Sequence, residues 1–156
     1  MNLLDRSKFK FKTQVRVRNY EIDWQGVVHN ANYLLYFEVG RVEYLERIGV
    51  KVDVNSIQHE SKVVVVRNEI DYRSPAKFGD VLDVHTRISF IRDTSFAFEG
   101  IIEHAETRRL IAENVSFHVW LDHTTNRPMR VPDVFRGVIQ RFEGETAVIS
   151  TPSTLI

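Results

Sequence analysis

The segment Ala31–Ile48 constrains the fold of this chain more than any other feature. Its apolar residues recur with the period of a helix, and its opening stretch, ANYLLYF, is apolar nearly all round apart from Asn32. Charged side chains enter only in its second half, and Gly49 then follows as a helix stop. A helix that is hydrophobic on all sides is a buried one. We therefore expect its first two turns to be covered on most sides.

Alternating segments surround this helix and have the period of half-buried β-strands. The predicted strands are Lys8–Tyr20, Val63–Tyr72, Val81–Ile91, Ser95–His104 and Leu110–Leu121. Short turns favour an antiparallel meander of the four strands that follow the helix. A last helix is predicted at Asp133–Phe142, where Pro132 suits its first turn. The tail beyond Gly144 has no clear period, and we expect it to be mobile.

This order predicts an α+β fold in which one long buried helix is wrapped by a curved antiparallel sheet of about five strands. The 156 residues suit a single domain over residues 1–156, with a core at about 9–143 and a tail at 144–156. The sheet can cover only one side of the helix. A second copy of the chain is the simplest cover for the other side, so we expect at least a homodimer.

Charge and composition exclude several classes of function. The chain has 21 basic and 21 acidic side chains, so it lacks the broad basic field that nucleic acids or anionic membranes require. A small phosphorylated ligand held by a few arginines stays possible. The absence of cysteine excludes disulfides, thiolate metal sites and a cysteine nucleophile. The start of the chain resembles no signal peptide and no stretch is long enough for a membrane span, so we expect a cytoplasmic protein.

Neither the histidines nor the common catalytic motifs indicate an active site in this sequence. No zinc-protease, dinucleotide-binding, phosphate-binding or nucleophile-elbow motif is present. The six histidines do not have metal-ligand spacings, so we expect no metal and no other cofactor. His85 and His104 lie among polar, outward-facing neighbours. His118 lies in the last predicted strand, and His123 follows two residues after the end of that strand. We interpret these four as surface or interface histidines.

The junction between Asp23 and Tyr33 holds the remaining candidates. A helix N-terminus presents unpaired N–H groups with a partial positive charge, which can stabilise a developing oxyanion. Gly26 allows the backbone to approach a bound carbonyl closely. Asp23 would then act as a nucleophile or as a general base for water, and the N–H groups of Asn30 and Ala31 would meet the oxyanion.

Structural roles explain the same residues without catalysis. An aspartate before a helix commonly stabilises a turn or caps the helix, and Asn30 is itself a good capping residue. His29 suits either a structural hydrogen bond or a pocket wall. From the spacing alone, both interpretations of the junction stay open.

Three motifs carry a resemblance to a known family. They are Asp23-x-x-Gly26-x-Val28-His29-Asn30-x-x-Tyr33, then Tyr36-Phe37-Glu38-x-x-Arg41, and finally Tyr72-Arg73-Ser74-Pro75-Ala76-x-x-Gly79-Asp80. The chain resembles hotdog-fold acyl-CoA thioesterases, in particular the 4-hydroxybenzoyl-CoA thioesterase and YbgC-like group, with acyl-carrier-protein thioesterases as close relatives. The resemblance extends over about Phe11 to Phe142.

The resemblance implies a hotdog fold that hydrolyses an acyl-CoA thioester to free acid and CoA, with active sites at a dimer interface. It implies that Asp23 is the catalytic aspartate and that the backbone N–H at Asn30 polarises the thioester carbonyl. The expected substrate-binding residues are Gly26, Val28, His29, Ala31 and Tyr33. Another hotdog subgroup uses a carboxylate on the helix, so Glu38, three residues before Arg41, stays a second catalytic candidate.

Several details of the substrate stay open. Trp24-Gln25 is bulkier than the residues that many relatives carry there, so the acyl group is undefined; Tyr33, Tyr36 and Phe37 could line its pocket with Trp24. The arginines near strand ends are candidates for the CoA phosphates. They are Arg73, Arg87, Arg92, Arg108 and Arg109, of which we favour Arg108, Arg109 and Arg92.

Three alternatives to an acyl-CoA thioesterase are compatible with this pattern. The substrate could be an acyl group on acyl-carrier protein, which would require a surface for an acidic protein. The chain could instead be a non-catalytic hotdog module that binds acyl-CoA, although binding alone does not require Asp23. A hydratase is less favoured, because the histidine and carboxylate pair of those relatives is not evident. The oligomer could be a homodimer or a homotetramer.

Overall fold

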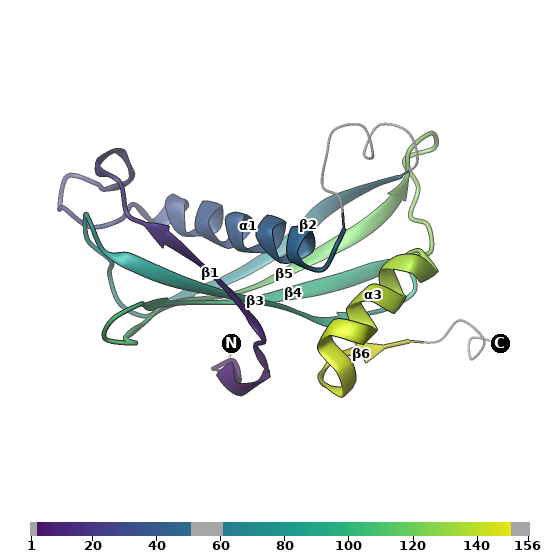
Figure 1. Cartoon of the computed structure of the whole chain (residues 1–156). Helices are drawn as coiled ribbons and strands as arrows, with labels where there is room; N and C mark the ends of the chain where they lie inside the picture. Colours follow the sequence, from purple (N-terminus) through teal and green to yellow (C-terminus); the bar gives the residue numbers. More distant parts are fainter. Residues whose placement is uncertain (1–2, 51–60, 151–156) are drawn as a thin grey trace. The chain divides into compact units, whose positions relative to one another are not determined.

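The computed structural model describes residues 3–50 and 61–150 (Figure 1). Its helices and strands are β1 (Phe11–Arg16), α1 (Asn30–Arg47), β2 (Ser61–Tyr72), β3 (Val81–Ile91), β4 (Ser95–His104), β5 (Leu110–Asp122), α3 (Asp133–Glu143) and β6 (Val148–Ile149). Three short 3₁₀ helices are η1 (Arg6–Lys8), η2 (Asn19–Glu21) and η3 (Gly144–Thr146). No helix in the described ranges is both long and apolar enough to cross a membrane.

Most predicted elements are present, and their ends differ mainly near the termini. β3 and β4 have the predicted bounds, and β5 and α3 each extend one residue further. β1 is shorter than expected, because the chain leaves the strand after Arg16 and forms η2. The segment after α3 contains η3 and β6, where the pattern predicts no ordered element. Residues 151–156, the rest of the predicted mobile tail, lie outside the described residues.

The strand order is β1-β3-β4-β5-β2, with β6 beside β3. β1 pairs antiparallel with β3, and β6 pairs parallel with it. The predicted meander is correct for β3, β4 and β5 but wrong for β2, which lies beside β5. The connection from β2 to β3 is too long for a hairpin turn, and the N–H groups of Arg73 and Ser74 at its start both donate to the carbonyl of Ile111 in β5.

The described chain divides into two compact units. Unit 1 consists of Met1–Tyr44, Glu69–Arg87 and Glu99–Val115. Unit 2 consists of Leu45–Asn68, Ile88–Phe98 and Ser116–Ile156. The long helix α1 and the strands β2 to β5 each begin in one unit and end in the other. That residues 1–156 form one domain stays a prediction.

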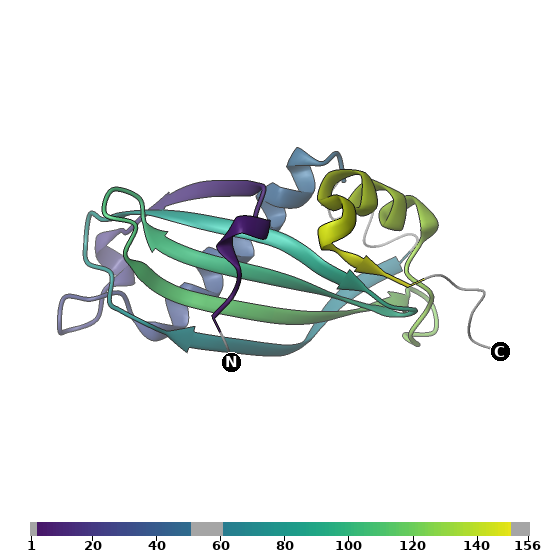
Figure 2. The same cartoon turned by 90° about the horizontal axis from the view of Figure 1, so that it is seen from below.

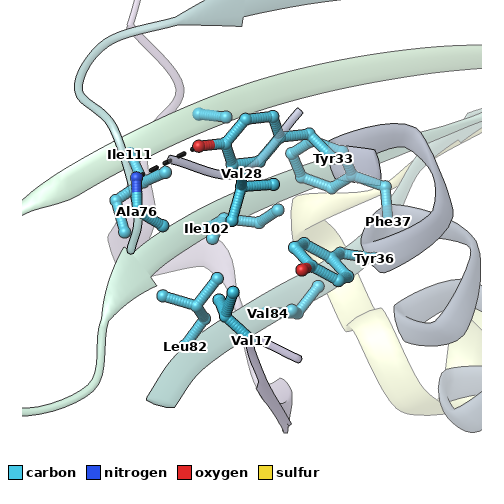
Figure 3. Close-up of a cluster of buried hydrophobic side chains, with 11 residues drawn as sticks. Val17, Val28, Tyr33, Tyr36, Phe37, Ala76, Leu82, Val84, Ile102 and Ile111 are labelled. Atoms are coloured by element: carbon cyan, nitrogen blue, oxygen red, sulfur yellow. Dashed lines mark hydrogen bonds between the residues drawn. The ribbon is translucent and has the colours of Figure 1, made fainter. Parts of the chain in front are cut away.

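In unit 1, α1 packs across one face of the sheet (Figure 1), and its inward side chains form the apolar core that Figure 3 shows. Tyr33, Tyr36 and Phe37 are each 4% exposed or less. The helix approaches the sheet closely at Gly40, where an added Cβ would lie 2.8 Å from Cγ1 of Val84.

The opposite side of α1 stays exposed among the described residues. Leu35 is 55% exposed and Val39 is 38% exposed. This exposure agrees with the expectation that the sheet covers only one side of the helix, and what covers the other side stays a prediction.

The other face of the sheet in unit 1 is crossed by the N-terminal segment, residues 3–9 (Figure 2). The backbone N–H of Leu4 donates to Glu113, and Arg6 donates to Glu103. Phe9, which lies within the predicted first strand Lys8–Tyr20, precedes β1 in the structure and contacts the ring of His85. His85 is 5% exposed, so its interpretation as a surface histidine is wrong.

Unit 2 is organised by aromatic rings and one buried arginine. Phe96 contacts Trp120 and Phe135 of α3 and stacks on His118, which is also buried rather than on the surface. Arg136 of α3 donates to four backbone carbonyls in the surrounding loops, those of Val131, Ser150, Arg92 and Asp93. These contacts fix α3 within unit 2.

Candidate active site

The loop before α1 is a tight turn closed by its own backbone. The N–H of Gly26 donates to the carbonyl of Asp23 at 3.0 Å, and the N–H of Asp23 donates to the carbonyl of Val27 at 2.7 Å. Gly26 has a φ of +83°, a left-handed conformation that favours glycine. One carboxylate oxygen of Asp23 accepts the N–H of Gln25 at 2.8 Å. Asp23 therefore stabilises the turn through one oxygen, and its second oxygen has no hydrogen bond among the described residues.

The first turn of α1 is capped by His29, whereas the sequence pattern favours Asn30 as the cap. The helix begins at Asn30, and Nδ1 of His29 accepts the N–H of Ala31 at 3.1 Å. This contact requires a neutral imidazole with its proton on Nε2. Within the described ranges, the N–H of Asn30 has no acceptor in the protein. Of the two N–H groups proposed for the oxyanion, that of Ala31 is taken by His29, and that of Asn30 is without an acceptor among the described residues.

A cavity of about 620 Å³ opens beside this loop and helix start, all within unit 1. It is lined by Asp23, Trp24, Val27, Val28, His29, Asn30, Tyr33, Tyr72, Arg73, Ser74 and Pro75. One wall is thus the loop and the start of α1, and the other is the end of β2 with the connection that follows it.

The two walls are joined by hydrogen bonds. The Tyr33 hydroxyl accepts the N–H of Ala76 at 3.1 Å, the bond drawn in Figure 3. The Tyr72 hydroxyl donates to the carbonyl of Asn30 at 3.3 Å. Arg109 supports only the wall that follows β2, because its Nη1 donates to Oγ of Ser74 at 2.6 Å and to the carbonyl of Pro75 at 2.8 Å.

Burial raises the pKa of the Tyr33 phenol above its ordinary value, and the N–H of Ala76 and the charge of Arg109 oppose this only in part. Tyr33 therefore stays protonated at neutral pH and presents a hydroxyl rather than a charge. The nearby charge of the Asp23 carboxylate contributes to the raised pKa of Tyr33 as the smallest of these causes.

Comparison with known proteins decides the family. The model of the thioesterase-like superfamily matches residues 17–139, which include the loop, α1 and the cavity walls. The chain belongs to this superfamily. It is a thioester hydrolase with a hotdog fold of the YbgC-like kind.

Relatives of this thioesterase act on two kinds of acyl carrier. This chain is 33% identical over 131 residues to a chloroplastic acyl-acyl carrier protein thioesterase of Arabidopsis thaliana, and the match covers 84% of this chain and 68% of that protein. It is 31% identical over 123 residues to the acyl-CoA thioester hydrolase YbgC of Escherichia coli, covering 78% of this chain and 90% of that protein. The crystal structure of a thioesterase from Thermus thermophilus, complexed with coenzyme A and Zn, has a TM-score of 0.76 at 31% identity and covers 88% of this chain and 96% of that chain.

The structure brings together five of the seven predicted catalytic and substrate-binding residues of this thioesterase. Asp23, Val28, His29, Asn30 and Tyr33 all line the cavity. Gly26 shapes the turn and Ala31 contacts His29, but neither lines the cavity. Trp24 lines it as well and is 92% exposed, whereas Tyr36 and Phe37 lie in the core.

The candidate phosphate-binding arginines lie in different places. Arg109 contacts the cavity wall, and Arg73 lines the cavity while its guanidinium pairs with Glu113. Arg108 is exposed at its turn, with a φ of 61°. Arg92 belongs to unit 2, where its guanidinium lies 4.6 Å from the ring of Phe90. Arg87 is 2% exposed and pairs with Glu99, so it is not a surface cation.

A second cluster of polar groups lies on the sheet face that the N-terminal segment crosses. The atoms of Asp83, His85 and Glu103 that could ligate a metal ion lie within 4.8 Å of one another. The spacing of the histidines in the sequence does not reveal this cluster. Both carboxylates are already paired with cations, Glu103 with Arg6 and Asp83 with Lys12. Glu38, the alternative catalytic carboxylate, is exposed on α1 and does not line the cavity.

The sequence pattern misses Glu21, a buried carboxylate directly beside the site. It is 8% exposed and ends η2, two residues before Asp23. In the sequence, Glu21 stands out only as a charged residue at the point where the alternation of the first strand ends. Charged residues are also common where an ordinary loop begins. The far wall, Tyr72 to Pro75, is found only through the family motif.

Proposed function

We propose that this chain hydrolyses an acyl-CoA thioester in the unit 1 cavity. The proposal is supported by the observation that Asp23 and Asn30 line one cavity. One carboxylate oxygen of Asp23 and the backbone N–H of Asn30 have no hydrogen-bond partner among the described residues. A carboxylate and one oxyanion donor suffice for a thioester, because a thiolate leaves readily without strong acid assistance.

In this proposal, Asp23 either attacks the thioester carbonyl or removes a proton from an attacking water. The carbonyl oxygen gains negative charge and meets the N–H of Asn30 at the positive end of α1. The carbon–sulfur bond then breaks, the thiolate leaves, and the net addition of water yields the free acid and the thiol. The neutral His29 keeps the N–H of Ala31, so the oxyanion relies on Asn30 first.

Coenzyme A is the carrier we favour, because cationic groups border the cavity wall. Arg109 fixes that wall with one nitrogen and retains further N–H groups for a phosphate, and Arg108 is exposed at the same turn. Acyl-carrier protein is the second candidate, and the relative from Arabidopsis thaliana supports it.

The test replaces Asp23 with Asn, which keeps the acceptor for the N–H of Gln25 and removes the charge. We expect thiol release from acyl-CoA to fall by at least about 10³-fold, while the circular dichroism spectrum stays unchanged. Matched acyl-CoA and acyl-carrier-protein substrates of several chain lengths identify the preferred carrier and acyl group. Turnover by Asp23→Asn at the wild-type rate would sink the catalytic assignment.

We also propose that the chain works as a homo-oligomer. The exposed Leu35 and Val39 of α1 require a cover, and a second copy can supply one from its own matching surface. Light scattering on the purified protein should give a mass of at least twice 18.3 kDa. A monomer at micromolar concentration would contradict this proposal. A cytoplasmic location stays a prediction.

A further inference from the structure

Glu21 is a buried carboxylate whose hydrogen bonds reach both the residue that caps η2 and the helix α1. A single oxygen, Oε1, accepts the backbone N–H of Arg18 at 2.7 Å and the hydroxyl of Tyr36 at 3.1 Å. Tyr36 lies on the buried face of α1 and is 3% exposed. Glu21 thus ties the start of η2 to the second turn of α1.

The backbone of the same residue fixes the start of the helix. The carbonyl oxygen of Glu21 accepts the N–H of His29 at 2.9 Å and Nδ2 of Asn32 at 2.7 Å. The loop between Glu21 and His29 is therefore closed at its base, and an isolated bridge between Ile22 and Val28 adds to this closure. Asp23 lies inside the closed loop, and the N–H of Asn30 lies directly after it.

We propose that Glu21 is a positioning residue that sets the distance between the Asp23 carboxylate and the N-terminus of α1, an inference that rests on the proposed function. The carboxylate holds η2 against Tyr36, and the carbonyl of the same residue holds His29 and Asn32. Movement of Glu21 would shift the two reacting groups relative to each other. A misplacement of about 1 Å can lower a rate by about 10²-fold.

The chemistry of the pair explains why an acceptor is required at this place. Burial and the neighbouring Glu21 raise the pKa of the Tyr36 phenol, so the phenol stays a donor over the working pH range. Without an acceptor, a buried hydroxyl and the N–H of Arg18 would both lose their partner. Since both donors meet one oxygen, a glutamine at this position can accept both bonds.

The experiment compares Glu21→Ala, Glu21→Gln and Tyr36→Phe in the full-length chain. We expect Glu21→Ala to lower kcat for thioester hydrolysis by about 30-fold to 100-fold and to change KM by less than about threefold. Glu21→Gln should keep kcat within about threefold of the wild-type value. Tyr36→Phe removes one of the two bonds and should give an intermediate kcat.

Hydrogen exchange supplies a readout that does not depend on activity. In Glu21→Ala, the amides of Asp23, His29 and Asn32 should exchange at least about tenfold faster, while those of β3 and β4 stay as slow as in the wild type. Unchanged exchange in this loop overturns the inference, whatever the activity. Faster exchange in a chain whose wild type hydrolyses no thioester would refute the proposed function and leave the anchoring role intact.

A matched control separates positioning from general loss of stability. Glu143 is a fully buried carboxylate of unit 2 that accepts the N–H of Ile88. Glu143→Ala should lower the free energy of unfolding but leave kcat and the exchange of the loop unchanged. If Glu143→Ala lowers kcat as much as Glu21→Ala, the effect is general and the inference fails. If Glu21→Ala does not fold, kcat and loop exchange in Tyr36→Phe decide, and wild-type values for both would overturn the inference.

Discussion

The two faces of the sheet in unit 1 are both buried, but they are buried by different means. The face beneath α1 is apolar, and the helix fills it with Tyr33, Phe37 and Gly40 at close approach. The opposite face carries charged and polar groups beneath the short N-terminal segment. It presents Asp83 and His85 from β3 and Glu103 from β4, each 5% exposed.

This difference determines what each face tolerates. On the face beneath α1, stability depends on volume, because rigid side chains already fill the space between helix and sheet. On the opposite face, stability depends on pairing, because each buried charge needs a hydrogen-bonded partner. The candidate site lies at the end of the α1 face, so changes that spare α1 and its loop should alter stability without altering catalysis.

The largest effect on stability is expected from an added methyl group at Gly40. In Gly40→Ala the new Cβ would lie 2.5 Å from Oγ1 of Thr86 and 2.8 Å from Cγ1 of Val84, so helix and sheet must separate. Overpacking of this kind costs about 1–3 kcal/mol, against a gain in helix propensity of about 1 kcal/mol. Because two contacts of the new Cβ fall below 3.0 Å, we expect an overpacking cost of about 2–3 kcal/mol, and hence a net loss of about 1–2 kcal/mol in the free energy of unfolding, measured by urea denaturation.

Gly137 provides the control, since it also lies inside a helix. A Cβ at Gly137 would meet only the flexible end of Arg141, at 3.3 Å. Gly137→Ala should therefore be neutral or stabilise the protein by up to about 1 kcal/mol through helix propensity. Equal stability of Gly40→Ala and wild type would contradict the close packing of α1 on β3.

The contrast between the faces also shows how far the fold follows from the sequence. Periodicity alone predicts α1 and the ends of β3 and β4, because local spacing reports which face a side chain occupies. It cannot place β2 beside β5, because strand pairing depends on contacts far apart in the chain. It also assigns His85 to the surface, because alternation separates the faces without showing that a distant N-terminal segment covers the polar one.

The site shows the same division between local and long-range information. The junction pattern predicts the cavity residues Asp23, His29, Asn30 and Tyr33, which lie within one loop and one helix turn. It favours Asn30 as the cap, whereas in the structure His29, one residue earlier, accepts the N–H of Ala31. The role of Glu21 depends on Tyr36, fifteen residues away, and so becomes visible only in the folded chain.

A smaller effect is expected in the pH dependence of stability, which depends on the charged groups of the face opposite α1. Burial lowers the pKa of His85 below its usual 6.5, although Glu103 opposes this in part. Burial alone would raise the pKa values of Asp83 and Glu103, but hydrogen bonds from Gln14 and Lys12 to Asp83, and from Arg6 and His85 to Glu103, outweigh it and lower both. For all three groups the unfolded chain binds protons more readily than the folded chain.

Stability should therefore fall with acidification in two stages. The contribution of His85 is fully present above about pH 6.5 and is lost as the pH falls through its lower folded pKa. The contributions of Asp83 and Glu103 are fully present above their unfolded pKa values of 3.8 and 4.5, and are lost as the pH falls further. Urea denaturation at closely spaced pH values between 7 and 3 measures both stages.

His85→Gln isolates the first stage and tests the contrast between the faces directly. Glutamine can still donate to Glu103 but does not titrate, so the free energy of unfolding at pH 7 should change by about 1 kcal/mol or less. Its decline just below pH 6.5 should flatten, whereas the decline below pH 4.5 should persist. Because His85 lies on the face away from α1, kcat at pH 7 should stay at the wild-type value. A large loss of kcat would show that the polar face contributes to catalysis, and would remove the functional distinction between the two faces.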